Sequence, residues 1–509
     1  MAYFIGVDIG TFESKGVMTD ARGTIIARAI RPHEMIVPRP GWAEHRPEQD
    51  WWGDFTVIAR SLLVTSGVAA EDIQAVAASA IGPCMLPLDA DGTPLMNGVL
   101  YGVDTRAVAE IAALTEKIGS ETLLARCNSS LTSQSVGPKI LWLKNRRPDL
   151  YAKARMFTSA APYITFRLTG VHAMDHFTAA GFTPLYDPAK QAWSNEFARG
   201  IVDRGCLPRL LWSSEIAGRV TQAAAAETGL AVGTPVVCGT IDAAAEALSV
   251  GVAGAGDMMV MYGSTIFIIQ ITAEQVRDPR LWYAPWLFEG LHTSQAGLAT
   301  SGTLTRWFAS EIYRDLPAGT VLGAMAEDAA RSPLGAKGLI VLPYFSGERT
   351  PIHDPQAKGV FFGLDLTHSR ADLYRGALEG IGYAVRHIVE TFEAAGHPPT
   401  RLVAVGGGTK NPVWLGAVSD IAGRPQVLRE ETTGASLGDA FLAALATGHA
   451  QRTDIEQWNK AANPREPQGE PVKSLYDRQY AIYRALYDRN RDLMATLSGL
   501  HDHSSEKTG

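Results

Sequence analysis

The chain has 509 residues, of which 46% are hydrophobic and 19% charged, and its formal net charge is −7. This composition is typical of a soluble globular protein, and the negative balance gives no electrostatic reason to expect nucleic acid or an anionic membrane as a partner. No run of about 18 apolar residues is present that would span a bilayer. The length exceeds that of one hydrophobic core, so we expect two large domains.

The cysteines predict a reducing environment. They lie far apart and show no CxxC spacing: Cys84, Cys127, Cys206 and Cys238. This pattern argues against a zinc site and against a disulfide framework. We therefore expect a cytoplasmic location.

The segment Phe4–Asp20 forms a predicted β-hairpin with unusual polar residues at its tip. An apolar run ends at Asp8, turns through Gly10-Thr11 and continues with Ser14 and Lys15. A carboxylate can hold Mg²⁺ directly or through water, while amides and hydroxyls bind phosphate oxygens. The pattern fits a metal–phosphate site, but an ordinary hairpin with a polar tip explains it equally well.

Strand and helix patterns alternate through the first half of the chain. A third strand is predicted over Thr24–Ala29, a helix over Trp51–Ser66 and a buried strand over Ile73–Ser79. Such alternation predicts an α/β layer fold.

A second hairpin of the same kind follows a glycine-rich stretch. Asp257–Gln270 reads as strand, turn and strand, with Gly263, Ser264 and Thr265 at the turn. Two such hairpins suggest a duplicated α/β lobe with a cleft between the copies. We place the N-terminal lobe at 1–250, the C-terminal lobe at 251–450, a helical extension at 451–500 and a disordered tail at 501–509. Tyrosines at helical spacing in the extension indicate a packing face: Tyr476, Tyr480, Tyr483 and Tyr487.

Asp242 follows an apolar strand that ends at Gly239-Thr240, at the point where a helix begins. An acid at this position can cap the helix. It can also act as the general base that orients a hydroxyl and accepts its proton during phosphoryl transfer.

The triple glycine Gly406-Gly407-Gly408 lies between a predicted strand and a helix that starts near Asn411. Consecutive glycines let a ligand approach the backbone, and a helix N-terminus favours anions. The spacing matches neither a dinucleotide fingerprint nor a P-loop, and a plain turn remains an alternative.

The opening hairpin, Asp242, the second hairpin and the glycine loop occur in this order along the chain. Together they resemble the FGGY carbohydrate kinases, whose superfamily also holds actin and the heat-shock chaperone ATPases. The resemblance extends from about Phe4 to about Gly448. Further similar segments support it: Gly41–Trp52, Gly137–Pro148, Gly338–Leu364 and Thr433–Gly448. It implies two ribonuclease H-like lobes with an interdomain cleft, ATP and Mg²⁺ as cofactors, and a small sugar or polyol as substrate.

The resemblance also implies residue roles. Asp8 would attend Mg²⁺ and Asp242 would be the general base. The phosphate end of ATP would be lined by Gly10, Thr11, Ser14 and Lys15, with Gly263, Ser264 and Thr265 at the terminal phosphates. The adenosine would be bordered by Gly406, Gly407, Gly408 and Asn411. Thr433–Gly448 would form a helix that closes the nucleotide side.

Departures from the family pattern bear on the substrate. Ile81-Gly82-Pro83 replaces the polar runs of glycerol and xylulose kinases and offers no side-chain hydrogen-bonding group. Asp104 and Arg106 survive as candidate sugar contacts, or form a structural ion pair. Ala180–Pro188 resembles the xylulose kinase branch, so a ketopentose such as xylulose is the expected substrate, with ribulose, erythritol or a hexulose as alternatives.

Two hypotheses from other functional classes remain open. The protein could be a non-catalytic sugar or nucleotide sensor on the same scaffold, or an actin-like or chaperone-like ATPase. The sequence also leaves a homodimer open. Glu13 stands where relatives carry a small hydroxyl residue. Its side chain either assists Mg²⁺, repels a misplaced phosphate or points to solvent.

Overall fold

The structure, a computed structural model, describes residues 1–505 and divides into two compact units. The first unit comprises Met1–Ala255, Ile271–Thr293 and Thr433–Lys460. The second comprises Gly256–Gln270, Ser294–Thr432 and the chain from Ala461 onward. The expected break near residue 250 is present, but two later segments belong to the first unit, so the division is not sequential.

The first unit contains a mixed sheet with the strand order β13-β14-β5-β1-β2-β3, to which β15 is added beside β5. Its strands are β1 (Tyr3–Ile9), β2 (Glu13–Asp20), β3 (Ile25–Pro32), β5 (Ile73–Ala80), β13 (Ile216–Arg219), β14 (Pro235–Val237) and β15 (Thr240–Ile241). β1, β2 and β3 form the antiparallel meander predicted from the opening hairpin, and β5 joins β1 in parallel. This register places Asp8 of β1 between Lys15 of β2 and Ser79 of β5.

The first unit also contains helices, several of which pack on this sheet, and shorter strands that lie outside it. The helices are α1 (Asp54–Ser66), α2 (Val108–Ile118), α3 (Ser120–Cys127), α4 (Val136–Arg146), α5 (Pro148–Lys153), α6 (Ala160–Thr169), α7 (His176–Ala180), α8 (Asn195–Ala198), α9 (Gln222–Thr228), α10 (Asp242–Ser249), α15 (Ala435–Ala446) and α16 (Ile455–Trp458). The shorter strands are β4 (Glu44–His45), β6 (Leu86–Leu88), β7 (Gly98–Val99), β8 (Met156–Thr158), β9 (Ala173–Asp175), β10 (Tyr186–Asp187), β11 (Ala192–Trp193), β12 (Arg209–Leu211) and β18 (Trp282–Pro285).

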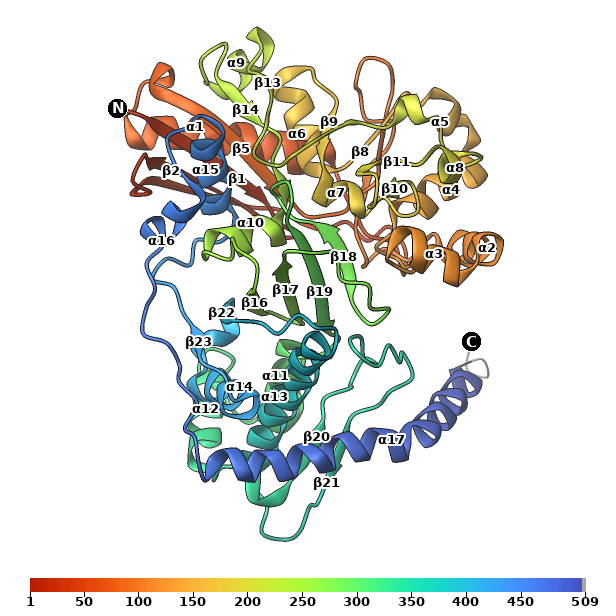
Figure 1. The fold of residues 1–509 in the computed structure, drawn as a ribbon, viewed down its shortest axis with the longest axis vertical. Coiled ribbons are helices and arrows are strands. Elements are labelled where there is room, and N and C mark those ends of the chain that lie inside the picture. The colour runs from red at the N-terminus through yellow and green to blue at the C-terminus, as the bar shows by residue number, and fades with distance from the viewer. Residues whose placement is uncertain (506–509) are drawn as a thin grey trace. The chain divides into compact units, whose positions relative to one another are not determined.

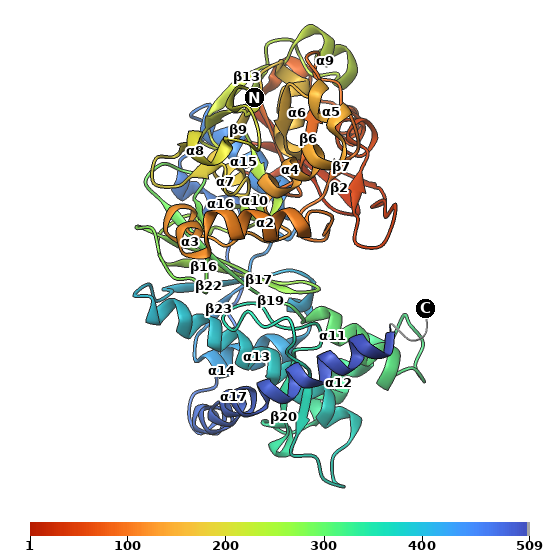
Figure 2. The same ribbon diagram turned by 90° about the vertical axis from the view of Figure 1, so that its right-hand side faces the viewer.

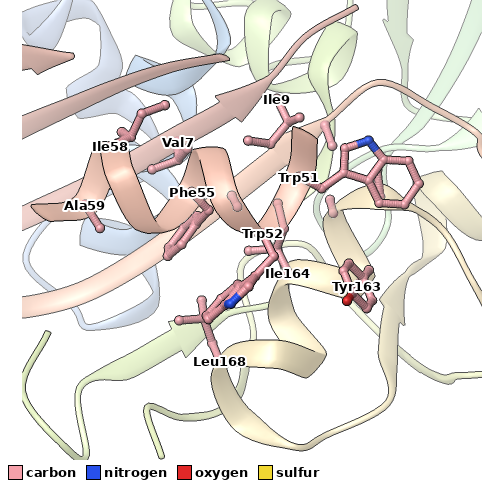
Figure 3. Packing of buried hydrophobic residues seen from close by; sticks show 14 of the residues in the cluster. Val7, Ile9, Trp51, Trp52, Phe55, Ile58, Ala59, Tyr163, Ile164 and Leu168 are labelled. Atoms are coloured by element: carbon pink, nitrogen blue, oxygen red, sulfur yellow. The ribbon is translucent and has the colours of Figure 1, made fainter. Parts of the chain in front are cut away.

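The core of the first unit lies between the sheet and the helices α1 and α6 (Figure 3). Trp52 stacks on Phe55 with ring centroids 5.8 Å apart, and Trp51 meets the edge of Tyr163 at 6.1 Å. Large aromatic side chains contribute much of the apolar area that such a core removes from water. The aromatic segment before α1 therefore anchors the end of the sheet at which Ile9 and the first turn lie.

The late helix α15 lies beside β1 in the first unit (Figure 1). A Cβ on Gly6 would come within 2.0 Å of the carbonyl oxygen of Ser436 and 2.4 Å of the amide of Ala440. On another side of α15, a Cβ on Gly438 would lie 2.1 Å from the carbonyl oxygen of Ala245 in α10. Glycine on β1 and on α15 thus permits backbone-to-backbone packing that any larger residue would block.

The second unit repeats the strand order of the first around its own hairpin. Its sheet contains the order β19-β17-β16-β22-β23, which corresponds to β3-β2-β1-β5-β14. Its strands are β16 (Asp257–Tyr262), β17 (Ile266–Thr272), β19 (His292–Leu298), β22 (Arg401–Val405) and β23 (Gln426–Val427), with β20 (Ile340–Leu342) and β21 (Val360–Phe362) as a separate pair. β16 is antiparallel to β17 and parallel to β22. The predicted duplication is therefore present in the topology.

The described part of the second unit also contains five α-helices: α11 (Gly302–Trp307), α12 (Val321–Arg331), α13 (Arg370–Ala394), α14 (Pro412–Ala422) and α17 (Val472–Ser505). Helices α13 and α14 pack side by side, and α17 crosses them (Figure 2). The tyrosine stripe of α17 is a packing face, as predicted. For example, Tyr483 is buried with its hydroxyl 2.7 Å from that of Tyr344, and Tyr476 donates to Glu379.

The predicted disordered tail differs in part from the structure, because α17 continues through Ser505. The rest of that prediction, residues 506–509, lies outside the described residues. No helix in the described chain is long and apolar enough to cross a membrane.

Candidate active site

Asp8 lies near the end of β1 with an incomplete set of hydrogen bonds. Its Oδ1 atom is buried and has no partner among residues 1–505. Burial raises the pKa of Asp8 well above its usual range, and the nearby carboxyls of Asp242 and Asp439 raise it further. A buried carboxylate oxygen without a donor is suited to a cation or to a water molecule that a cation holds.

Asp242 is the first residue of α10 and directly follows β15. Its Oδ1 accepts a hydrogen bond from the amide of Ala243 at 2.7 Å. Burial raises the pKa of Asp242 to about 7, with a further contribution from Glu246. A carboxyl that titrates near neutral pH is better suited to accept a proton from a hydroxyl than an ordinary aspartate.

Two further carboxyls belong to this cluster, and the sequence analysis did not include them. Glu246 lies one helical turn after Asp242 on α10, and burial raises its pKa to about 6. Asp439 lies on α15 and is wholly buried; burial raises its pKa well above the usual range. The available signals were the i,i+4 spacing of Asp242 and Glu246, and an acid inside the small-residue segment of Asp439.

Lys15 is the cation of this cluster. Its Nζ lies 2.8 Å from Oε1 of Glu13, and both side chains are partly exposed. Burial acts to lower the pKa of Lys15, but the hydrogen bond and charge of Glu13, together with Asp8, raise it overall. Glu13 therefore pairs with Lys15 instead of pointing freely to solvent.

Ser14 does not face the turn. Its side chain is fully buried, and its hydroxyl donates to Asp54 at 2.8 Å. Strand alternation explains this orientation, because neighbouring residues on β2 point to opposite faces of the sheet. We therefore remove Ser14 from the expected phosphate ligands and assign it to the support of β2.

The turn between β1 and β2 is tight. Gly10 donates its amide to the carbonyl of Glu13 at 3.0 Å, and a Cβ on Gly10 would lie 2.7 Å from that same oxygen. The Thr11 hydroxyl lies 3.2 Å from the hydroxyl of Tyr101. Gly10 and Thr11 thus occupy the tip of the hairpin, as the sequence predicts.

Asp104 and Arg106 form a buried ion pair. Both side chains are inaccessible, and the guanidinium donates to Asp104 through Nε and Nη2 and to Glu44 at 2.8 Å. Its central carbon lies 3.8 Å from the ring centroid of Trp42. Of the two interpretations, the structure supports the structural ion pair, which ties the segment after β7 to β4.

The loop Ile81-Gly82-Pro83 packs against Ile241, the residue before Asp242. Ile81 donates its amide to Ile9, and a Cβ on Gly82 would lie 2.8 Å from a side-chain atom of Ile241. Beyond this loop, the buried Lys139 donates to the carbonyls of Leu100 and Tyr101. The loop thus contributes apolar groups and backbone beside Ile241.

In the second unit, the turn Gly263–Thr265 is held from the N-terminus of α11. The carbonyl of Gly263 accepts from the Ser301 hydroxyl and the Gly302 amide, each at 3.1 Å. The carbonyl of Ser264 accepts from the amide and the hydroxyl of Thr303 at 3.0 and 3.1 Å. Within the described chain, the amides of Ser264 and Thr265 donate to no acceptor.

The glycine loop lies directly on this hairpin's first strand. Gly406 has φ +91°, and a Cβ there would lie 2.7 Å from the carbonyl oxygen of Tyr262. Gly408 packs equally closely on Trp414 and Tyr262. Gly406 and Gly408 thus pack against Tyr262, the residue before the turn Gly263–Thr265, and this close packing requires glycine at positions 406 and 408.

Asn411 is used by the helix that follows. Its Oδ1 accepts from the amides of Val413 and Trp414 at 3.0 and 3.2 Å, and its Nδ2 donates to the hydroxyl of Tyr374 at 3.3 Å. This is the N-cap of α14. We therefore assign Asn411 to helix capping instead of to an adenosine contact.

The described side chains that could ligate a cation near Asp8 are few. No group of three or more His, Cys, Asp or Glu side chains in the described part of the chain is arranged to hold a metal ion. Mg²⁺ commonly keeps several waters and binds through one or two carboxylates together with substrate phosphates. The unpartnered oxygen of Asp8 fits that mode and does not fit an all-protein metal cage.

Models of one protein family match nearly the whole chain. The N-terminal domain of the FGGY family of carbohydrate kinases matches residues 3–249, and its C-terminal domain matches residues 258–447. The chain belongs to the FGGY family of carbohydrate kinases. It is therefore a carbohydrate kinase with the two-lobed α/β fold of that family.

Individual relatives agree with this FGGY assignment. The chain is 30% identical to the xylulose kinase of Bacillus subtilis, over 98% of this chain and 99% of that protein. A gluconokinase of the same organism is 25% identical, over 89% of each. The solved xylulose kinase of Rhodospirillum rubrum is 30% identical with a TM-score of 0.91, covering 97% of this chain and 99% of that one.

Proposed function

We propose that this FGGY kinase transfers the terminal phosphoryl group of Mg-ATP to a hydroxyl of a ketopentose, with xylulose as the first candidate. The observation that carries the proposal is the position of Asp242. This carboxyl begins α10, has a pKa raised to about 7, and interacts with the partly unpartnered carboxylate of Asp8. Phosphoryl transfer to an alcohol requires an acceptor for the hydroxyl proton and neutralisation of phosphate charge.

ATP as the donor is supported by the family and by a related fold. The glycerol kinase of Plasmodium falciparum, solved with ADP, has the same fold, with a TM-score of 0.86 at 19% identity. In this chain, the amides of Ser264 and Thr265 and the glycine loop provide backbone donors that fit phosphate oxygens.

Asp8 is the residue we propose for Mg²⁺, held with water and phosphate oxygens. The bound cation would neutralise charge on the phosphates. Lys15 would add a second positive charge at the same end of β1. In this arrangement Asp242 orients the attacking hydroxyl and takes its proton, and most of the rate comes from positioning and charge neutralisation.

Xylulose is preferred because the relatives of highest identity described above carry that name. The gluconokinase relative and the apolar loop at Ile81–Pro83 favour a second candidate on the same scaffold, another sugar or sugar acid. A few contacts in one pocket decide between such substrates.

A substrate panel tests the proposal. ADP release is measured with Mg-ATP and xylulose, ribulose, erythritol, a hexulose, gluconate and glycerol, and each product is identified by mass. We expect the highest kcat/KM with a ketopentose. Gluconate or another compound as best substrate would contradict the ketopentose assignment, and ligand binding without phosphorylated product would favour a sensor. ATP hydrolysis stimulated by unfolded peptide and not by sugar would support a chaperone-like ATPase.

A further inference from the structure

Two buried histidines contact the backbone of the β1–β2 turn. Nε2 of His33 lies 3.1 Å from the carbonyl oxygen of Gly10, and Nε2 of His45 lies 3.1 Å from that of Thr11. The backbone amide of His33 donates to the next carbonyl, that of Phe12, at 2.9 Å. Three successive carbonyls of the turn are therefore held by two residues.

The proton positions on His45 follow from its neighbours. Nδ1 of His45 accepts a hydrogen bond from Nε1 of Trp51 at 3.1 Å, because an indole N–H can only donate. Burial and the neighbouring His33 lower the pKa of His45 to about 4. The ring is thus neutral near pH 7 and carries its single proton on Nε2, which donates to Thr11.

His33 lies between two acceptors. Its Nδ1 is 2.8 Å from Oδ2 of Asp54, and its Nε2 faces Gly10. Both ring nitrogens of His33 thus lie within hydrogen-bonding distance of an acceptor oxygen. The charged and titratable groups around it are Asp54 of α1, Arg31 of β3, which pairs with Asp54 at 2.5 Å, and His45, whose ring centroid is 4.9 Å away.

The other side of the turn remains open for a ligand. Within residues 1–505, the amides of Thr11 and Phe12 donate to no acceptor. Successive free amides in a turn form a concave anion-binding site when their carbonyls are held back. The histidines hold those carbonyls.

We propose that His33 and His45 are positioning residues that fix the Gly10–Phe12 turn so that its free amides bind the phosphate end of the nucleotide. Neither imidazole touches the reacting atoms in this proposal. Each acts through the carbonyl it holds. The inference rests on the proposed use of Mg-ATP. It adds His33 and His45, which lie outside the carboxyl cluster, to the residues that support nucleotide binding.

The test compares amide side chains of two lengths at His45. Glutamine places an N–H near the position of Nε2, whereas asparagine is too short to reach Thr11. We expect His45→Asn to raise KM for ATP and Kd for MgADP by roughly 5- to 10-fold, the effect of losing one hydrogen bond. His45→Gln should restore both values to near those of the wild type, and KM for the sugar should stay constant in both.

His33→Gln and His33→Asn give the same comparison for Gly10. His172→Gln is the matched control, because His172 is a partly buried histidine of the first unit whose Nε2 atom is buried and has no partner in the described chain. Nucleotide constants equal to wild type in both asparagine variants, or the same rise in the His172→Gln control, would overturn the inference.

A second measurement needs no variant. Hydrogen exchange at the amides of Thr11 and Phe12 should slow when wild-type enzyme is saturated with MgADP. If wild-type enzyme binds MgADP and exchange at these two amides does not slow, the role of the turn is contradicted, but the use of Mg-ATP is not. Wild type that fails to bind any Mg-nucleotide would contradict the nucleotide proposal as well.

Discussion

Ser79 donates both its backbone amide and its hydroxyl to the same carboxylate oxygen of Asp439, at 3.0 and 2.7 Å. The other oxygen of Asp439 is buried and has no partner among the described residues. The pair links β5 to α15, although the two residues are 360 positions apart in the chain. It therefore joins the late helix to the strand beside Asp8.

This link predicts different effects for two substitutions of Asp439. Burial raises the pKa of Asp439. Asp439→Asn keeps a side-chain oxygen that can accept both hydrogen bonds of Ser79, so we expect the apparent Tm of this variant to be nearly unchanged. Asp439→Leu leaves two buried donors of Ser79 unpaired and should cost roughly 2–4 kcal/mol of stability. Thermal denaturation at pH 7 measures both. Ser436→Ala is the control, since that buried hydroxyl has no partner in the described part and its removal should cost little. Equal stability of the Leu and Asn variants would contradict the prediction.

The activity should depend on the ionisation of Asp242. Because its pKa is about 7, the carboxyl is protonated below that pH, and kcat should rise as pH increases through about 7. Asp242→Asn should lower kcat by at least about 100-fold while MgADP still binds. The pH–rate profile and nucleotide titration check this. Glu246→Gln serves as control: it should keep the limb but move it to a lower pH, because Glu246 contributes to the raised pKa of Asp242. Loss of that limb in Glu246→Gln would show that the ionisation belongs to Glu246 and not to Asp242.

Ionisation of Asp242 should also lower the stability of the folded protein as pH rises from about 4 to 7. Asp242 releases its proton at a higher pH when folded than when unfolded, so the folded state binds more protons between about pH 4 and 7. Stability contributed by this group therefore falls as pH rises through that window. Asp242→Asn should raise the apparent Tm relative to wild type at pH 8 and show a smaller difference at pH 4. A difference in apparent Tm between Asp242→Asn and wild type that stays constant from pH 4 to pH 8 would argue against a destabilising charge on Asp242.

The ion pair of Arg106 predicts a stability defect without a substrate defect. Arg106→Leu strands the buried carboxylates of Asp104 and Glu44 and should cost about 3–5 kcal/mol, because a buried charge without its partner is costly. KM for the sugar should be unchanged in the folded fraction. The control is Arg39→Leu, an exposed guanidinium 3.5 Å from the ring centroid of Trp42. A stable Arg106→Leu variant with a raised sugar KM would restore Arg106 as a substrate contact.

Removal of Glu13 should change the response to Mg²⁺. Glu13→Thr frees Lys15 from its carboxylate partner and makes the end of β1 more positive. The variant should stay active, with its rate reaching saturation at a different free Mg²⁺ concentration. Initial rates at fixed ATP over a Mg²⁺ series measure this. A profile identical to wild type would show that Glu13 does not influence the cation.

Much of the fold was predictable because local patterns determine it. The strands of both hairpins, the helix after Trp51 and the tyrosine face of α17 were each predicted from periodicity and turn residues. The non-sequential make-up of the first unit was not predictable in this way. It depends on Gly6 and Gly438 meeting distant backbone, and sequence periodicity contains no information on long-range contacts.

The candidate site was predictable to a lesser degree. The motif order placed Asp8, Asp242 and the two glycine-containing turns in suitable positions, but it could not distinguish exposed polar residues from buried ones. Ser14, Asn411 and Arg106 are polar residues whose hydrogen bonds are used by the protein itself. Glu246 and Asp439 went unnoticed because an isolated acid in a helix is usually exposed.

The position of α15 has a consequence for how the protein is made. The β1–β2–β3 meander is among the first segments to leave the ribosome, whereas the helix that covers Gly6 is synthesised more than 400 residues later. At the usual rate of elongation the nascent chain waits roughly 20 to 90 seconds for that helix. During this time the face of β1 that α15 covers is open to other chains. Early termination before Thr433 should therefore yield an aggregation-prone fragment in place of an independently folded first unit.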